Sequence, residues 1–313
     1  MEKYIFGVDI GGTTVKLGLF KTEGTLLEKW EIRTRKEDEG KYIIKDIVET
    51  LENKLNENNI SKSEVLGIGI GVPGPVKEDG TVLKCVNLGW KVFNIIDEVN
   101  KLLKLPIKAA NDANVAALGE MWRGGGKGYK NAVMITLGTG VGGGIIIDGK
   151  IISGSNGAGG EIGHIKVSDN ETECCGCGNK GCLEQYASAT GIVSLANKAL
   201  KTMKTKSDLK NFENLSAKDI FDSAKAGDEL ALELVDDFGN RLGKALANIS
   251  CVIDPDIFVI GGGVSKNGSF LIESITKHFK GNAFHSSRNT KFELAKLGND
   301  AGIYGAARLI CGN

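Results

Sequence analysis

Residues 4–20 read YIFGVDIGGTTVKLGLF, and this stretch decides the fold class. A short apolar run ends at Asp9-Ile10, a Gly-Gly-Thr-Thr turn follows, and an apolar segment broken by Lys16 extends over Val15–Phe20. Apolar runs bounded by glycine predict a strand, a tight turn and a second strand.

The same plan returns at residues 132–147, which read AVMITLGTGVGGGIII. Its glycines match the letters of the dinucleotide fingerprint, but that fingerprint needs a helix directly after the turn. The isoleucines Ile145–Ile147 predict a strand instead, which argues against a nicotinamide-binding module. A repeated strand–turn–strand unit indicates an internally duplicated chain.

Helical and strand patterns alternate along the rest of the chain. The other predicted elements are strands at 26–32, 65–72, 106–110 and 256–260, helices at 42–55, 95–103, 111–121, 270–279 and 301–310, and a mainly helical region at 188–252.

The composition excludes several classes of protein. The chain has 313 residues, with 39 Lys plus Arg against 39 Asp plus Glu, so its charge favours neither nucleic acid nor membrane partners. It has no run of about 20 apolar residues that could span a bilayer. Met1–Thr13 lacks the pattern of a secretory signal. We therefore expect a cytoplasmic protein of two lobes.

The glycine turns predict phosphate binding. Without side chains, backbone N–H groups can converge on an anion, and Thr139 adds a hydroxyl donor. Asp9 at a strand end can hold Mg²⁺ through water. Gly261-Gly262-Gly263 follows an apolar strand and lets a helix start close to adenine or ribose. The alternatives are plain glycine-rich hairpins and a plain strand-to-helix turn.

Four of the 7 cysteines lie between Cys174 and Cys182. Cys175, Cys177 and Cys182, together with His164 upstream, supply the three thiolates and one imidazole of a closed tetrahedral zinc site. Such a site is structural, and the clustering argues against disulfides. A metal-free reduced loop is the alternative. Because Cys174 adjoins Cys175, we do not expect it to bind the same ion, and we expect the three scattered cysteines, at 85, 251 and 311, to be buried.

Asn111-Asp112 lies where a strand turns into a helix. A carboxylate there could cap the helix, or it could accept the proton of an attacking hydroxyl during phosphoryl transfer. Glu161 and Glu184 bracket the cysteine loop, where a metal would fix two acids able to bind a polyol. The alternative is that both are solvated surface glutamates.

In order, these motifs resemble the ROK sugar kinase family, and within it the bacterial glucokinases, over nearly the whole chain. The matching segments are DIGGTTVK at 9–16, GIGVPGPV at 69–76, NLGW at 87–90, NDANVAALGE at 111–120, LGTGVGGG at 137–144, EIGH at 161–164 and CGCGNKGCLE at 175–184.

The resemblance implies an actin-like, ribonuclease H-like ATPase fold of class α/β, with two lobes and an interlobe cleft. It implies an N-terminal lobe over residues 1–112, onto which a C-terminal helix at about 300–313 packs back. The larger lobe, residues 113–299, would contain the zinc loop. A hinge is expected near residues 111–120, and the family is commonly dimeric or larger, so a homodimer or homotetramer is expected.

The resemblance also implies an ATP-dependent kinase that converts glucose to glucose 6-phosphate. Asp112 would be the general base, His164 would be shared by zinc and sugar, and Mg²⁺ would accompany ATP. The implied sugar-binding residues are Asn111, Glu161, His164, Glu184 and Gly74. The implied ATP-binding residues are Asp9, Gly11, Gly12, Thr13, Thr14, Lys16, Gly138, Thr139, Gly140, Gly142, Gly261, Gly262 and Gly263.

The sequence departs from the family pattern at two positions, and alternatives for the acceptor, the donor and the class of protein remain. Ala110 replaces an acidic residue that glucokinases often have before Asn-Asp, and Cys174 is extra. The acceptor could instead be fructose, mannose, N-acetylglucosamine or N-acetylmannosamine, and the donor could differ from ATP. A sugar-responsive repressor of the same family would carry a DNA-binding segment first, whereas here Tyr4 already begins the first strand.

Overall fold

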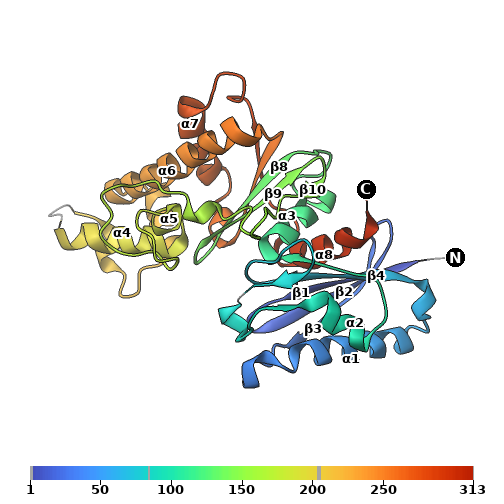
Figure 1. Ribbon diagram of the computed structural model, residues 1–313. Coiled ribbons are helices and arrows are strands. Elements are labelled where there is room, and N and C mark those ends of the chain that lie inside the picture. The colour runs from blue at the N-terminus through green and yellow to red at the C-terminus, as the bar shows by residue number, and fades with distance from the viewer. Residues whose placement is uncertain (1–2, 84, 203–205, 313) are drawn as a thin grey trace. The chain divides into compact units, whose positions relative to one another are not determined.

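The computed structural model describes residues 3–83, 85–202 and 206–312 (Figure 1). The chain divides into two compact units, each with its own set of internal contacts. The first unit comprises residues 1–130, 144–160 and 296–313, and the second comprises 131–143 and 161–295. The first unit therefore includes the segments 113–130 and 144–160, which lie beyond the lobe boundary expected at residue 112.

The first unit is built on a five-stranded sheet in which β1, β4 and β7 are parallel and β2 and β3 are antiparallel. The order across the sheet is β3-β2-β1-β4-β7. The strands are β1 (Tyr4–Ile10), β2 (Thr14–Lys21), β3 (Leu26–Arg33), β4 (Val65–Val72) and β7 (Ile107–Asn111). The short strands β5 (Thr81–Val82) and β6 (Phe93–Asn94) form a separate two-stranded sheet.

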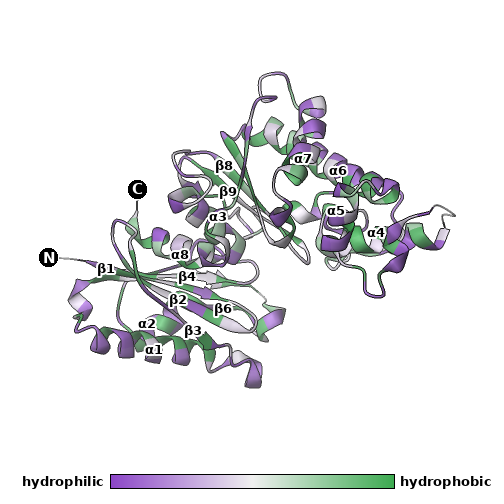
Figure 2. Ribbon diagram, turned by 180° about the vertical axis from the view of Figure 1, so that it is seen from behind, coloured by the Kyte–Doolittle hydropathy of each residue, from purple (hydrophilic) through white to green (hydrophobic). Residues whose placement is uncertain are grey.

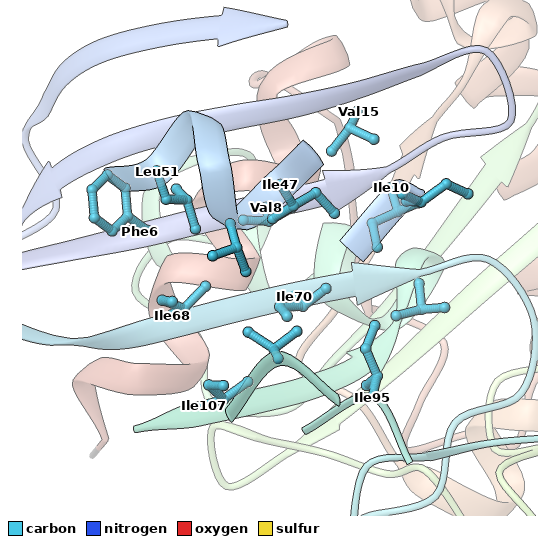
Figure 3. Packing of buried hydrophobic residues seen from close by; sticks show 14 of the residues in the cluster. Phe6, Val8, Ile10, Val15, Ile47, Leu51, Ile68, Ile70, Ile95 and Ile107 are labelled. Carbon is cyan, nitrogen blue, oxygen red and sulfur yellow. The ribbon is translucent and has the colours of Figure 1, made fainter. Parts of the chain in front are cut away.

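One face of this sheet packs against α1 (Ile43–Glu57) and α2 (Ile95–Leu102). Alternate strand residues such as Phe6 and Val8 meet helix residues such as Ile47 and Leu51 there, all of them buried (Figure 3). The outer side of α1 is polar (Figure 2). Buried apolar residues recur at every second position in the strands and at about every fourth position in the helix. This spacing gives each element one apolar face, and burial of these faces against each other explains why both elements form.

The opposite face of the sheet carries α8 (Ala301–Cys311), and α3 (Asp112–Arg123) packs against α8. Glycines allow this close approach. A Cβ built on Gly7 would lie 2.1 Å from the carbonyl oxygen of Ile303, and one on Gly69 would lie 1.6 Å from that of Ala306. The helix backbone therefore fills the space that side chains in β1 and β4 would occupy.

A second five-stranded sheet has the order β10-β9-β8-β11-β12, with β8, β11 and β12 parallel. It repeats the strand order of the first sheet, which agrees with the duplication inferred from the glycine turns. The strands are β8 (Ala132–Leu137), β9 (Val141–Ile147), β10 (Lys150–Ile151), β11 (Ile257–Gly261) and β12 (Lys291–Leu294).

In the described part of the second unit there are four α-helices. They are α4 (Ala189–Thr202), α5 (Ala217–Lys225), α6 (Glu229–Ile253) and α7 (Ser269–Asn282) (Figure 1). Short 3-10 helices complete the chain: η1 (Glu37–Gly40), η2 (Lys62–Glu64), η3 (Val86–Leu88), η4 (Ile162–His164), η5 (Leu183–Gln185), η6 (Asp208–Asn211), η7 (Gly263–Asn267) and η8 (Gly298–Asp300). In the described ranges, no helix is both long and apolar enough to cross a membrane.

Most expected elements are present, and the expected strands at 65–72 and 132–137 have the observed bounds. An observed strand had not been predicted, and one expectation, the burial of Cys251, was wrong. Strand β12 was not expected, because its sequence KFEL lies in a polar stretch, and its residues alternate between exposed and partly buried. Cys251 is exposed on α6, whereas Cys85 is buried and Cys311 is partly buried.

Candidate functional site

Two carboxylates lie at the same edge of the first sheet. Asp9 is near the end of β1, and Asp112 begins α3 directly after β7. Between them runs β4, in which Gly71 is the partner of both Asp9 and Ala110. The carboxyl ends of parallel strands are where α/β sheets bind ligands. The sheet thus brings two acids from distant parts of the sequence to one edge.

Asp112 is held in a defined orientation. Its Oδ1 accepts hydrogen bonds from the Ala113 backbone N–H at 2.8 Å and from the Asn111 side-chain amide at 2.9 Å. The pKa of Asp112 is raised to about 6, mainly by burial and also by the charge of Asp9, and hydrogen bonds such as those from Ala113 and Asn111 oppose the shift. Burial also raises the pKa of Asp9, and Lys16 opposes that shift. A carboxylate with a pKa near 6 suits a general base at neutral pH.

Asn111, and not Asp112, caps α3. Its side-chain oxygen accepts the backbone N–H of Asn114 at 3.1 Å, and its amide donates to the carbonyl oxygen of Gly74 at 3.1 Å. Gly74 has a φ of 92°, a conformation that favours glycine. The side chain of Asn111 therefore orients Asp112 and fixes the loop after β4.

The first glycine turn is pinned by backbone and hydroxyl contacts. Gly11 donates its N–H to the carbonyl of Thr14, and Thr34 donates its N–H to the carbonyl of Thr13 and its hydroxyl to that of Gly11. A Cβ built on Gly12 would meet no atom within 4 Å, so an anion could approach the backbone there. Lys16, opposite Asp9 in β2, donates to the carbonyl of Asn299.

The second glycine turn, between β8 and β9, is held on several sides. The backbone N–H of Ala189 donates to the carbonyl of Gly138 at 2.8 Å, and the hydroxyl of Thr190 donates to that of Thr139 at 2.6 Å. The space around Gly138 is open, as it is around Gly12. Gly142 lies one residue into β9.

His164, Cys175, Cys177 and Cys182 come together in the second unit, with their ligand atoms within 4.8 Å of one another. The Sγ atoms of Cys177 and Cys182 are 3.6 Å apart, and Cys175 Sγ lies 3.7 Å from His164 Nδ1. In a tetrahedral zinc site, with Zn–S bonds of about 2.3 Å and Zn–N bonds of about 2.0–2.1 Å, ligand atoms lie about 3.5–3.8 Å apart. The four side chains therefore fit zinc, and Cys174 lies outside the group.

Burial raises the pKa of Cys175, and it raises that of Cys182 to about 12. These thiols would therefore stay protonated at neutral pH unless a cation favoured their ionised form. A bound zinc ion supplies that charge.

Glu161 and Glu184 lie beside this group. Glu161 Oε2 is 3.8 Å from His164 Nε2, the ring nitrogen that faces away from Cys175. Glu184 Oε2 accepts the backbone N–H of Val141 at 2.9 Å. The second unit therefore brings both predicted acids close to the predicted metal ligands.

Gly261-Gly262-Gly263 joins β11 to η7 and then to α7, so a 3-10 turn comes before the expected helix. Gly262 has a φ of 84°, and a Cβ on it would lie 2.4 Å from the carbonyl oxygen of Leu137. Around Gly263 the space is open. This turn therefore packs directly behind the start of the second glycine turn.

A cavity of about 630 Å³ borders the second glycine turn and was not predicted from the sequence. Polar side chains of α4 and of the start of α5 line it, among them Thr190, Ser194, Asn197, Lys198 and Ser216, together with Thr139. These residues are scattered along helices and form no motif, so no sequence signal could have found them.

Two further residues of α3 were not singled out. Asn114 is buried, and among the described residues its Oδ1 has no hydrogen-bond partner. Glu120 is fully buried, and its carboxylate accepts backbone N–H groups from Gly125, Lys296 and Leu297. Both lie in the segment NDANVAALGE. Its residue pattern predicts a helix but does not indicate that these two polar side chains are buried.

Comparisons with known proteins agree with this geometry. The model of the ROK family matches residues 5–312. A glucokinase of Halalkalibacterium halodurans is 44% identical over 99% of this chain and 95% of its own. A glucokinase of Streptomyces griseus, solved with glucose and AMPPNP, is 34% identical with a TM-score of 0.74 over 98% of both chains. A ROK hexokinase of Thermus thermophilus is 29% identical with a TM-score of 0.79 over 97% of this chain and 96% of its own.

These solved structures establish the actin-like α/β fold for this sequence. The matches cover nearly the whole chain and include both glycine turns, the Asn111-Asp112 pair and the cysteine loop. The chain belongs to the ROK family.

Proposed function

We propose that the protein is an ATP-dependent glucokinase that transfers the γ-phosphoryl group of MgATP to the 6-hydroxyl of glucose. The observation that carries this proposal is the orientation of Asp112 at the carboxyl edge of the sheet, with a pKa of about 6. The similarity to curated glucokinases over 99% of the chain supports glucose as the acceptor.

In this reaction Asp112 orients the sugar hydroxyl and accepts its proton. The hydroxyl oxygen attacks the γ-phosphorus, the bond from that phosphorus to the β–γ bridging oxygen breaks, and ADP leaves with the electron pair. Such a transfer depends mainly on positioning and on stabilising the phosphoryl charge. The hydrogen bonds from Ala113 and Asn111 both go to Oδ1 of Asp112, and we propose that Oδ2 receives the proton of the substrate.

The two glycine turns are proposed to bind the phosphates, with Gly11, Gly12, Thr13 and Thr14 in the first and Gly138, Thr139, Gly140 and Gly142 in the second. The N–H groups of Gly11 and Gly138 donate within the turns, to the carbonyls of Thr14 and Gly140, so these two residues would shape the turns. Lys16 adds a positive charge to the first turn. Mg²⁺ bound to ATP would neutralise phosphate charge, and Asp9 would hold it through water. We place adenosine near Gly261–Gly263 and the cavity lined by Asn197 and Ser216.

Asn111, Glu161, His164 and Glu184 are proposed to bind the other sugar hydroxyls, with Gly74 beside Asn111. His164, Cys175, Cys177 and Cys182 would hold a structural zinc ion, which supplies charge and rigidity to the loop and takes no part in the chemistry. A reducing compartment suits these thiols, so we propose a cytoplasmic enzyme. We further propose that the two units are its lobes and that it acts as a homodimer or homotetramer.

The test is a coupled assay of ADP formation with MgATP on glucose, fructose, mannose, N-acetylglucosamine and N-acetylmannosamine. A clear lead for glucose in kcat/KM is the expected result. A higher kcat/KM for another sugar would change the assigned acceptor and leave the assignment as a sugar kinase unchanged. Turnover of none of them by zinc-loaded protein, with ATP or another donor, would overturn the enzyme proposal.

A further inference from the structure

Glu184 contacts both the predicted phosphate turn and the predicted metal group. It lies in η5, two residues after Cys182. Its Oε2 accepts the backbone N–H of Val141 at 2.9 Å, and its Oε1 lies 3.7 Å from Cys175 Sγ. One side chain therefore connects the end of the β8–β9 turn with the cysteine loop.

The backbone on both sides of this contact is tightly packed. A Cβ built on Gly140 would lie 2.1 Å from Glu184 Oε2, and one on Gly163 would lie 2.2 Å from the carbonyl oxygen of Val141. Gly163 precedes His164, so segments that carry metal ligands touch Val141 at both its N–H and its carbonyl. Larger residues at 140 or 163 would displace this packing.

The other side of the turn is fixed independently of the cysteine loop. Ala189 and Thr190 at the start of α4 bind the carbonyls of Gly138 and Thr139. The turn thus has one support on α4 and one on Glu184. Backbone amides bind an anion well only if they are already aimed at it, because alignment at the moment of binding costs conformational entropy.

We infer that Glu184 is a positioning residue for nucleotide binding. Through its hydrogen bond with the Val141 N–H, it keeps the phosphate turn ordered as long as the metal-bound cysteine loop is ordered. This inference rests on the proposed function and adds to it, because sugar contact alone would give Glu184 no effect on the nucleotide. Glu161 provides the comparison, since it lies beside His164 Nε2 and sugar binding is its only proposed role.

The experiment measures the affinity for ADP with Mg²⁺, without sugar, by calorimetry on zinc-loaded wild type, Glu184→Ala, Glu184→Gln and Glu161→Ala. We expect Glu184→Ala to weaken ADP binding about tenfold or more, the range for losing a hydrogen bond to a charged group. Glu184→Gln should recover most of the affinity, because its amide oxygen can still accept the Val141 N–H. Glu161→Ala should bind ADP like the wild type.

Metal analysis of each variant should find zinc retained, which separates the effect from loss of the ion. Removing zinc from the wild type with a chelator should weaken ADP binding as well. ADP affinity that is unchanged in Glu184→Ala, or in the chelated wild type, overturns the inference while leaving a glucokinase intact. Wild-type protein that binds neither ADP nor glucose overturns the proposed function itself.

Discussion

Asp112, the proposed general base, lies in surroundings that disfavour its charged form. Its carboxylate is largely removed from water and faces the charge of Asp9, and both conditions raise its pKa. Hydrogen bonds such as those from Ala113 and Asn111 compensate in part. A group whose charged form is disfavoured at the working pH is a common mark of a catalytic base.

Replacing Asp112 with Asn should reduce turnover by about 10²-fold or more, the usual range for a general base. The amide keeps the size of the side chain and an oxygen that can accept the Ala113 N–H, so ADP binding should change little. Steady-state assays with glucose and ADP calorimetry check the two effects. Near-wild-type turnover would exclude Asp112 as the base.

The same variant should be more stable than the wild type at neutral pH. The pKa of Asp112 is about 6 in the folded protein and 3.8 in the unfolded chain. Below about pH 4 this difference does not lower the free energy of unfolding, because the carboxyl group is protonated in both states. The loss of unfolding free energy grows as the pH rises and becomes constant above about pH 6. Asp112→Asn should therefore raise the unfolding free energy at pH 7.5 by on the order of 1–2 kcal/mol. Denaturant titrations at pH 7.5 and 5 should show the gain shrinking at the lower pH; a gain that is equal at both would contradict this origin.

The pKa of Asp112 also predicts the acid limb of the activity profile. Because the base must be ionised, kcat/KM should fall below about pH 6, towards tenfold per pH unit. In Asp9→Asn, whose residual activity is expected to be low, the limb should move to lower pH, since the charge of Asp9 contributes to the shift. Rates measured from pH 5 to 8 test both statements, and a limb unmoved in Asp9→Asn would rule out that electrostatic contribution.

At the scale of secondary structure, Glu120 joins the end of α3 to the chain that enters α8. Its buried carboxylate accepts three backbone N–H groups, one from Gly125 and two from Lys296 and Leu297. A Cβ on Gly124 would lie 1.9 Å from Glu120 Oε2, so the glycine turn after α3 is shaped around this side chain.

Glu120→Ala should lower the unfolding free energy by about 3 kcal/mol or more, because each buried N–H left without an acceptor costs about 1–3 kcal/mol. The exposed Glu49 of α1 provides the control, and Glu49→Ala should change stability by less than about 0.5 kcal/mol. Denaturant unfolding of both variants measures the difference. Similar losses in the two would show that the contacts of Glu120 contribute little.

Elements with strong local signals were predictable from sequence. The apolar run of β4, bounded by polar and Pro-Gly residues, predicted the observed bounds, and the spacing of the cysteines predicted the group with His164. What could not be predicted depends on tertiary packing. Burial of Glu120, the bond from Glu184 to Val141 and the cavity near Asn197 each join segments whose proximity no local pattern encodes.

At the scale of the whole molecule, two sheets with the same strand order carry different sets of groups. The first unit holds Asp9, the Asn111-Asp112 pair and one glycine turn, and the second holds the other turn and the metal ligands. Duplication thus provides two similar frameworks, each of which keeps a glycine turn between its first two strands. Only the second framework has an inserted cysteine loop.

This division predicts a local response to metal loss. Cys177→Ser removes one exposed ligand and should reduce zinc well below the one ion per chain expected for the wild type, whereas Cys174→Ser, also exposed but outside the group, should keep it. Hydrogen exchange should then speed up in Cys177→Ser over residues 161–185 and at the turn 138–141, because the ion no longer orders the loop that holds Val141. Exchange in β1, β4 and β7 should stay slow, since their core contains none of these ligands. Equal loss of protection in both units would mean that the ion stabilises the whole chain, and zinc-free wild-type protein with full activity would refute the metal site.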